Sequence, residues 1–349
     1  MTPIHLTGLG NISPQKTFDN DGFLDEVTGM ETTHLKVVDP VYKDFISGDI
    51  LRRMGRISKM GITAAKLAMK DAGCDMPDAI ITATGLGCIE DTEKFLTSMI
   101  RNKEEFLTPT SFIQSTHNTV GAQIALLLKC HQYNFTYVHR GASFESALLD
   151  AMTRLHTGQS GEVLLGGIDE LTPQTLAILQ RLGHTRIHPV NNLQALTRPA
   201  RGAVAGEGSA FFVLSSRPGS RPYASIRDLR ILFYPGKDEI ESVLTELTAE
   251  GKPDAIVLGV SGDTANDRVY EPFRKGILRD LPQICYKHLC GEYFTASAFS
   301  LWLGARILSS GTVPEIVRLG PRPPAGIKKL LLYNHFRNIN HSFILISRP

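Results

Sequence analysis

The sequence predicts an α/β fold made of two similar halves arranged in layers. Short β-branched or aliphatic runs alternate with amphipathic stretches, which is the pattern of buried strands and covering helices. This series occurs twice along the 349 residues, on either side of a segment rich in proline, glycine and serine at 216–222. Because such strands are buried on both faces, we expect helices from both halves to meet at the centre of an α-β-α-β-α arrangement.

The first half, residues 1–216, alternates expected strands with expected helices. The strands are apolar runs bounded by turn residues, and the helices carry apolar residues at helical spacing. Strands are expected at 4–9, 79–85, 135–139, 162–167 and 209–216, and helices at 56–72, 118–129, 144–156 and 173–182.

The second half, residues 217–349, has a similar series of elements. It opens with the segment 224–234, a helical pattern at 238–250 follows, and a longer helix is expected from about Glu292 to Leu308. Strands are expected at 255–260, around Ile284, at 330–333 and at 343–346. The halves show no sequence repeat, so we expect them to share only the order of their elements.

The charge and the residue pattern exclude several classes of function. The 37 basic and 35 acidic side chains leave a formal charge of +2, so no global field favours binding to nucleic acid. The N-terminus has no basic and apolar leader, and no run of about 18 apolar residues occurs. We therefore expect a cytoplasmic protein without membrane contact.

Neither the cysteines nor the histidines form a metal-type pattern. His184 and His188 are four residues apart, but Pro189 follows at once and no acidic or cysteine partners are near in sequence. The scattered cysteines indicate reduced thiols rather than disulfides or a zinc site; they are Cys74, Cys88, Cys130, Cys285 and Cys290. We expect no metal and no cofactor.

The most distinctive motif lies at 197–214, where Arg198-Pro199 and Arg201-Gly202 precede Gly206-Glu207-Gly208 and an expected strand. The N-terminal T-G-L-G-N-I-S-P, the segment 52–73 and the strand at 161–170 accompany it. Together they resemble the β-ketoacyl synthase family of the thiolase superfamily, although the Asp and Phe of the family's R-P-F-D loop are missing. The resemblance implies a thiolase-like fold, a dimer, and acyl substrates delivered on a carrier protein.

The family's condensing reaction uses a cysteine thiolate at the N-terminus of a helix, which stabilises the anion. The corresponding strand-to-helix corner reads FTYVHRGASFESALLDAM. Counting back from Gly166-Gly167 places the family cysteine at Gly141, whereas counting forward from the preceding helix places it at His139. Neither residue is a cysteine, so the resemblance implies no catalytic nucleophile at this corner.

The two histidines that the family uses to hold a malonyl carboxylate are also missing. The match of the family's N-A-H-G-T places the first at Gly259, and the match of K-S-M-T-G-H places the second at Glu292, with Lys287 retained. A carboxylate at Glu292 repels a malonyl carboxylate unless it is protonated or paired with Lys287. His288 lies four positions earlier and does not replace the second histidine.

The family's glycine-rich closing loop, N-S-F-G-F-G-G-T-N, reads NHFRNINHS at 334–342. Asn334 and Phe336 are retained, but the glycines are lost. Because glycine lets the backbone approach a thioester and donate an N–H, we expect this approach to be impaired.

Losses at four separate catalytic segments on a retained scaffold make the chain similar to a chain-length factor. The resemblance to such cysteine-less subunits implies pairing with an active ketosynthase in polyketide, polyene or fatty-acid-type chain elongation. Within that group the sequence is most similar to subunits of aryl-polyene or flexirubin-type pigment synthesis. Arg52, Arg53 or Arg186 are candidates for docking the carrier.

Two other functions remain open at this stage. One is a divergent acyltransferase that works as a homodimer and uses Ser143 or another side chain in place of cysteine as its nucleophile. Serine at a helix start is more often an N-cap that accepts an N–H two or three residues on, and Glu145 then adds favourable charge in the first turn. A third alternative is a sensor of acyl chains or acyl carriers without an enzymatic partner.

Overall fold

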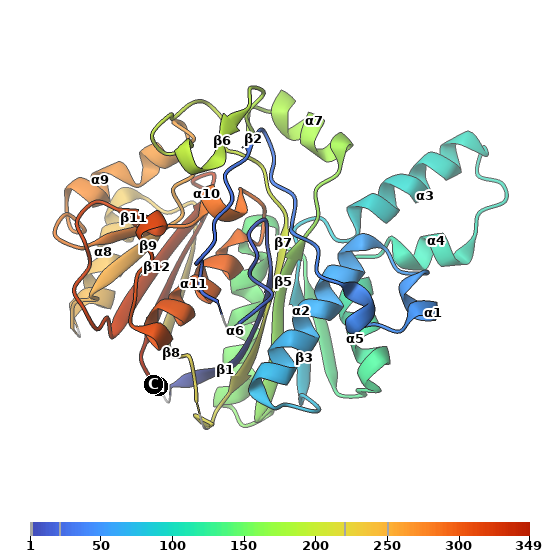
Figure 1. Cartoon of the computed structure of the whole chain (residues 1–349), viewed down its shortest axis with the longest axis horizontal. Helices are drawn as coiled ribbons and strands as arrows, with labels where there is room; N and C mark the ends of the chain where they lie inside the picture. The colour runs from blue at the N-terminus through green and yellow to red at the C-terminus, as the bar shows by residue number, and fades with distance from the viewer. Residues whose placement is uncertain (1–2, 21, 220, 250) are drawn as a thin grey trace.

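The computed structural model describes residues 3–20, 22–219, 221–249 and 251–349. In this part of the chain an 11-stranded mixed sheet forms the body of the molecule (Figure 1), and a two-stranded ribbon lies beside it. The large sheet contains β1 (Ile4–Ile12), β3 (Ala79–Ala83), β4 (Tyr133–Tyr137), β5 (Glu162–Asp169), β7 (Gly208–Ser215), β8 (Ala224–Phe233), β9 (Ala255–Leu258), β10 (Gln283–Cys285), β11 (Arg318–Leu319), β12 (Lys329–Phe336) and β13 (Asn340–Ser347). The ribbon is β2 (Glu31–Thr32) and β6 (Val190–Asn191).

The strand order repeats from the middle of the sheet outward. One side runs β1-β7-β5-β3-β4 and the other runs β8-β13-β12-β9-β10-β11. On each side, the first three strands pair with one another in antiparallel fashion. The third strand then pairs in parallel with the fourth, which joins β5 to β3 on one side and β12 to β9 on the other. The division at residue 216 stays a prediction, and the repeated order supports it.

The helices form the layers between and outside the two sides of the sheet. They are α1 (Gly48–Leu51), α2 (Arg56–Ala72), α3 (Ile89–Arg101), α4 (Pro109–Gln114), α5 (Thr119–Leu128), α6 (Ser143–His156), α7 (Pro173–Arg181), α8 (Lys237–Ala249), α9 (Glu271–Lys275), α10 (Lys287–Cys290) and α11 (Ala296–Ser310). Figure 1 shows α6 and α11 at the centre of the molecule. None of the helices in the described ranges is long and apolar enough to cross a membrane.

Separate apolar clusters confirm the predicted layered α/β class. The central cluster joins α6 residues such as Phe144 and Leu148 with α11 residues such as Phe299 and Trp302. A second cluster holds the buried face of α2 against the first half of the sheet, and a third holds α8 against the second half. The central helices are thus covered by sheet on both sides, which buries their N-terminal ends deeply.

Helix α2 shows how the sequence sets one of these layers. Its apolar face is buried, and Gly73 ends it in the left-handed conformation with φ 67°. On the strand below, a Cβ at Gly10 would lie 2.0 Å from the carbonyl oxygen of Ala64. Glycine is therefore required on β1 for the helix to lie directly on the strand.

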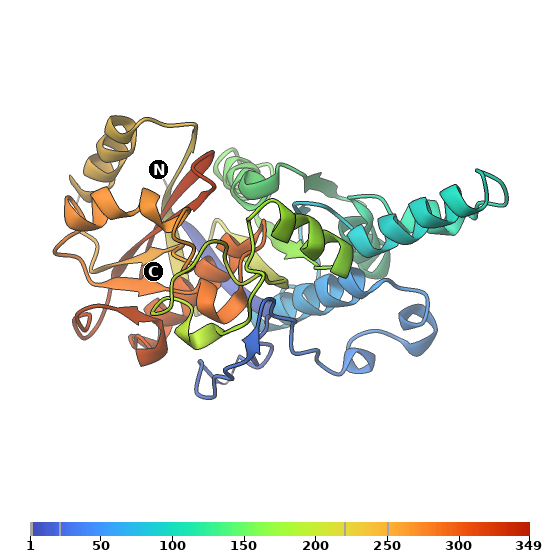
Figure 2. The same ribbon diagram turned by 90° about the horizontal axis from the view of Figure 1, so that it is seen from above.

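Two regions differ from the sequence expectations. Helix α11 begins at Ala296 and not near Glu292, because Glu292 forms a bridge with Ala205 and exchanges backbone hydrogen bonds with Val204 and Gly206. Helices α3 and α4 were not expected; they form an arm that extends away from the body (Figures 1 and 2). Neither arm helix has a buried residue.

Two buried carboxylates tie the loops around the sheet together. Glu207 is fully buried, accepts two hydrogen bonds of 2.7 Å from Arg56, and also accepts the backbone N–H groups of Val37 and Leu171. Asp169 at the end of β5 accepts hydrogen bonds from the Gly85 backbone and from both the backbone and side chain of Thr295. Asp169 thereby joins the end of β3 to the start of α11.

We expect Glu207→Ala to lower the free energy of unfolding by about 3 kcal/mol, because it leaves a half-buried guanidinium and two backbone N–H groups without their acceptor. Denaturant titration measures this loss. The control is Glu271→Ala, which breaks the exposed Glu271–Lys275 pair and should leave stability unchanged. Equal effects of the two substitutions would contradict the anchoring role of Glu207.

Candidate functional site

The candidate site begins at the corner where β4 turns into α6. Arg140 has a left-handed backbone with φ 47°, which is rare for a residue with a side chain. Gly141 follows it, is buried, and lies directly before the first turn of α6. The corner thus keeps the sharp strand-to-helix geometry that presents a residue at a helix N-terminus, but it presents no side chain.

The space beside Gly141 is filled by an aromatic side chain from β12. A Cβ at Gly141 would lie 2.2 Å from both Cβ and Cγ of Phe336. The Phe336 ring contacts the Phe294 ring at 5.2 Å between centroids, and Phe294 covers Gly85 in the same manner. We call Phe294 and Phe336 the aromatic plug, because together they occupy the corner where a nucleophile would project.

His139, the other candidate for the cysteine position, points elsewhere. It is exposed, and its Nδ1 lies 3.3 Å from the hydroxyl of Ser146 on the outer part of α6. The structure therefore places Gly141 at the buried corner and His139 outside it. The assignment of Gly141 to the family's nucleophile position remains a proposal.

The hydroxyl of Ser143 forms hydrogen bonds with three backbone groups. Ser143 is fully buried; its Oγ accepts the N–H of His139 at 2.7 Å and lies 2.8 Å from the carbonyl oxygens of Thr84 and Arg140. The expected N-cap bond to an N–H further along the helix does not form, because the serine is already inside the first turn and bonds backwards. A hydroxyl so engaged is poorly placed to attack a thioester.

Glu145 lies in the first turn of α6, as expected, but in the core. Its side chain is fully buried, and the Ser342 hydroxyl donates to its Oε1 at 2.9 Å. Burial raises the pKa of Glu145 above its usual range. The residue is therefore a core hydrogen-bond acceptor between α6 and β13.

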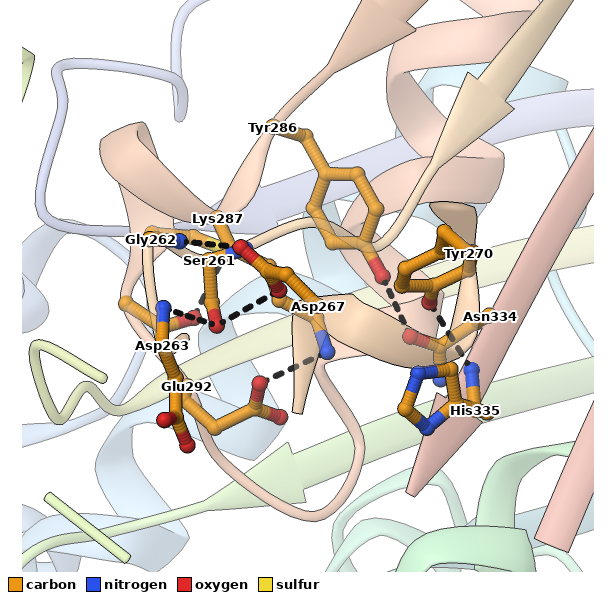
Figure 3. A network of polar contacts seen from close by, with 12 residues as sticks. Ser261, Gly262, Asp263, Asp267, Tyr270, Tyr286, Lys287, Glu292, Asn334 and His335 are labelled. Atoms are coloured by element: carbon orange, nitrogen blue, oxygen red, sulfur yellow. Dashed lines mark hydrogen bonds and ion pairs between the residues drawn. The ribbon is translucent and has the colours of Figure 1, made fainter. Parts of the chain in front are cut away.

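The space beside Gly259, which the sequence resemblance aligns with the family's first histidine, is filled by polar core residues. A Cβ at Gly259 would lie 2.3 Å from Oδ1 of Asn334 and 2.7 Å from the Tyr270 hydroxyl. The Tyr286 hydroxyl donates to Asn334 Oδ1, and the Tyr270 hydroxyl accepts the backbone N–H of His335. Figure 3 shows these rings converging on the end of β12. The retained Asn334 is thus a packing residue at this position.

Glu292, which the sequence resemblance aligns with the second histidine, is paired with Lys287. Lys287 Nζ lies 2.7 Å from Glu292 Oε2, and the side chains expose only 1% and 17% of their surfaces (Figure 3). Burial raises the pKa of Glu292, while Lys287 opposes the rise. Asp267 lies nearby and has both oxygens occupied by the Ser261 and Gly262 backbone. The charge on Lys287 is therefore already engaged.

His288 does not enter the site, as the sequence indicated. It is buried, and its Nε2 donates to the carbonyl oxygen of Ile316 at 2.9 Å. Burial lowers the pKa of His288 to about 4. The imidazole is consequently neutral at physiological pH, and its Nε2 is engaged by Ile316.

The closing loop keeps a left-handed backbone without its glycines. Arg337 and Asn338 have φ values of 52° and 56°, and the Ile339 N–H donates to the Phe336 carbonyl oxygen, which closes a tight hairpin between β12 and β13. The expectation that the lost glycines impair the approach of this backbone to a thioester stays a prediction. What the substitutions change is the set of side chains around the turn.

Asn338 joins two histidines that the sequence analysis did not single out. Its backbone N–H donates to His335 Nδ1, and its side-chain oxygen accepts from His341 Nε2. His341 Nδ1 in turn accepts from the Tyr333 hydroxyl. The sequence carries one sign of this chain of hydrogen bonds. In NHFRNINHS, three glycines of the family's loop are lost and two histidines are present where the family has none.

The other proposed functional side chains are separated from this site. Arg186 is buried and donates to the carbonyl oxygens of Ala195, Arg198, Gly202 and Gly262, so its proposed role in carrier docking was wrong. Arg52 is exposed and contacts Asp49. All of the cysteines are buried as free thiols, and burial raises the pKa of Cys74, Cys88 and Cys285 to about 12. The described chain therefore offers no thiolate to the corner.

Comparison with known proteins supports the sequence resemblance. Residues 10–218 match the family described as beta-ketoacyl synthase, N-terminal domain. The ishigamide ketosynthase/chain length factor is similar over 100% of this chain and 99% of its own, with a TM-score of 0.82 and 20% identity. A β-ketoacyl synthase from Burkholderia phymatum STM815 covers 100% of both chains, with a TM-score of 0.76 and 17% identity.

A third similar structure is that of a type II PKS acyl-carrier protein in complex with its ketosynthase bound to the hexaketide. It covers 100% of both chains with a TM-score of 0.75 and 15% identity. At these identities the similarity shows the thiolase-like fold. No curated protein matches the chain by sequence.

We expect Gly141→Ala to destabilise the protein by about 1–3 kcal/mol, because the added Cβ overlaps Phe336 and forces a backbone shift. In a Phe336→Gly background the same substitution should cost much less, because the overlapping side chain is gone, so the two substitutions should be strongly non-additive. Unfolding free energies of the two single variants and the double variant measure the coupling. Additive effects would contradict the contact between the aromatic plug and the nucleophile position.

We expect Lys287→Met to cost about 3–5 kcal/mol at pH 8, because it leaves the Glu292 carboxylate buried without a partner. A carboxyl whose folded pKa is raised binds more protons when folded, so stability rises as pH falls from that pKa toward the unfolded value of 4.5. The cost should therefore shrink toward pH 5. Unfolding titrations at both pH values test this, with the exposed Lys275→Met as the control; a cost independent of pH would refute it.

Proposed function

The chain belongs to the β-ketoacyl synthase family, and we propose that it is a non-condensing, chain-length-factor-type subunit that pairs with an active ketosynthase. The observation that carries this proposal is the corner at Gly141, where the aromatic plug fills the space of a nucleophile's side chain. On this proposal Gly141, Gly259 and Glu292 stand at the positions of the family's cysteine and histidines. The partner supplies the thiolate.

The chemistry of these positions argues against condensation by this chain alone. Attack on a thioester needs a thiolate at the helix N-terminus, and decarboxylation needs donors that stabilise a developing oxyanion. Glycine at 141 and 259 supplies neither a nucleophile nor a donor side chain. Glu292 places a carboxylate at the site where a malonyl carboxylate would be held, and the neighbouring Lys287 already pairs with it. An acyltransferase based on Ser143 gains no support, because its hydroxyl is engaged by the backbone.

An exposed sheet edge supports a protein partner. In the described part of the chain β4 pairs only with β3, so its other edge is free for strand addition. Phe135 on β4 and Val138 just after it expose 47% and 45% of their surfaces. The flanking helices add Leu126 of α5 and Leu149 of α6, which expose 76% and 49%. We propose that this β4 surface, made of these four residues, receives the active ketosynthase.

The similar proteins suggest the rest of the assembly. One is a ketosynthase/chain length factor, and another is an acyl-carrier protein in complex with its ketosynthase. We accordingly propose an acyl carrier protein as the second partner and polyketide-type chain elongation as the process. The narrower assignment to aryl-polyene or flexirubin-type pigment synthesis rests on the sequence resemblance.

The test is reconstitution with an intact ketosynthase, an acyl carrier protein and malonyl donors. This chain alone should give no condensed product, the mixture should, and replacing the partner's catalytic cysteine should abolish the product. Product formation by this chain in the absence of a ketosynthase would refute the proposal. A stable homodimer that does not associate with any ketosynthase would refute the partner role and leave the sensor alternative.

We expect Phe135→Asp to weaken association with the ketosynthase at least tenfold, because a charge at the centre of a sheet-edge interface must be desolvated. Sedimentation or light scattering of the mixture measures the complex. Phe233→Asp is the matched control, since Phe233 exposes 68% of its surface on β8, outside the β4 surface. Equal affinities for the two variants would place the interface elsewhere.

A further inference from the structure

A small cavity of ≈ 40 Å³ lies between the aromatic plug and the Glu292 side chain. This is room for a few water-sized groups, since a single water needs about 10–15 Å³ on the same measure. We call it the polar slot. It is lined by Leu179, His184, Thr185, Ala203, Asp263, Asn266, Glu292, Tyr293, Phe294, His335, Phe336 and Arg337.

Several side chains of the polar slot have unused hydrogen-bonding atoms. His335 and Thr185 expose only 1% and 4% of their surfaces, yet His335 Nε2 and Thr185 Oγ1 have no hydrogen-bond partner among the described residues. Asn266 Oδ1 is also buried and unpartnered. The backbone of Asn266 also lies close to the His335 ring and favours its protonation. Because orphaned buried polar atoms are costly, their gathering at one cavity indicates a ligand site.

The direction of the hydrogen bonds fixes what His335 offers to this cavity. The Tyr333 hydroxyl donates to His341 Nδ1, His341 Nε2 donates to the Asn338 side chain, and the Asn338 N–H donates to His335 Nδ1. The proton of the neutral His335 ring therefore sits on Nε2. Burial and the nearby Lys287 and His341 lower the pKa of His335 well below its usual value, which keeps the ring neutral. His335 is thus a neutral donor facing the slot.

Asn266 Oδ1 requires a donor, whereas His335 Nε2 requires an acceptor. Asn266 Oδ1 is an acceptor, and Thr185 can donate or accept. A group that carries an acceptor and a donor side by side satisfies all three atoms. An anion does not, because it offers no donor to Asn266, and the cationic Arg337 in the lining is offset by the carboxylates of Glu292 and Asp263.

We propose that the polar slot binds a small neutral group of the carboxamide type, with its carbonyl oxygen on His335 Nε2 and its N–H on Asn266 Oδ1. The proposal rests on the non-condensing role, in which this region no longer holds a malonyl carboxylate. The side chains of the changed closing loop, Asn338 among them, then set the chemistry of a different ligand.

The test uses full-length protein labelled with ¹⁵N-histidine and three probes of similar size, acetamide, acetate and methylammonium, at constant ionic strength. Acetamide should shift the His335 Nε2 resonance in a saturable manner, and acetate and methylammonium should not. The resonance is assigned by its loss in His335→Gln. No saturable shift, or a shift by acetate or methylammonium at equal concentration, would overturn the proposal.

A matched pair of threonine substitutions tests whether the probe occupies the slot. Thr185→Val should weaken acetamide binding about three- to tenfold, which is the loss of one neutral hydrogen bond. Thr63→Val removes another buried and unpartnered hydroxyl, on α2 outside the slot, and should leave binding unchanged. Equal binding by both variants would contradict the proposed site. Failure here is distinct from failure of the partner role, because reconstitution with a ketosynthase uses no such probe.

Discussion

The packing of Phe336 against Gly141 joins the end of β12 to the corner between β4 and α6, and the candidate site depends on this contact. Because residue 141 has no Cβ, the tip of the β12–β13 hairpin can reach the corner between β4 and α6. The Phe336 ring then fills the volume that a side chain at residue 141 would need. The hairpin can therefore take this position only because residue 141 has no side chain. The same hairpin carries His335 and Asn338. Its position therefore also sets where the His335 ring lies in the polar slot.

Each of the other vacated positions is occupied by a specific neighbour. Asn334 and Tyr270 fill the space beside Gly259, and Lys287 neutralises Glu292. These contacts are buried and hydrogen-bonded, and such networks rigidify a core when they are satisfied. The chain keeps the thiolase-like scaffold and an exposed sheet edge, which are the parts that the proposed structural partner of an active ketosynthase needs.

Much of the fold was predictable from the sequence, but the contacts that define the site were not. Helix α2 has the predicted bounds, because its apolar period and the glycine after it are local signals. The start of α11 was misplaced because Glu292 pairs with Ala205, a contact between distant segments. The spacing of the family motifs aligned Gly141, Gly259 and Glu292 with the family's cysteine and histidines. It did not reveal that Phe336 covers Gly141 or that Asn338 links His335 to His341, since the first contact joins residues far apart in sequence and the second depends on the hairpin turn.

The central claim is that this chain carries no acyl group covalently. Intact-protein mass spectrometry after incubation with acyl-carrier and acyl-thioester donors tests it most directly, with the partner ketosynthase in the same mixture as a positive control. The account predicts an acyl adduct on the ketosynthase and an unchanged mass for this chain. An adduct on this chain that disappears in Ser143→Ala would contradict the account and make the protein an acyltransferase with a serine nucleophile.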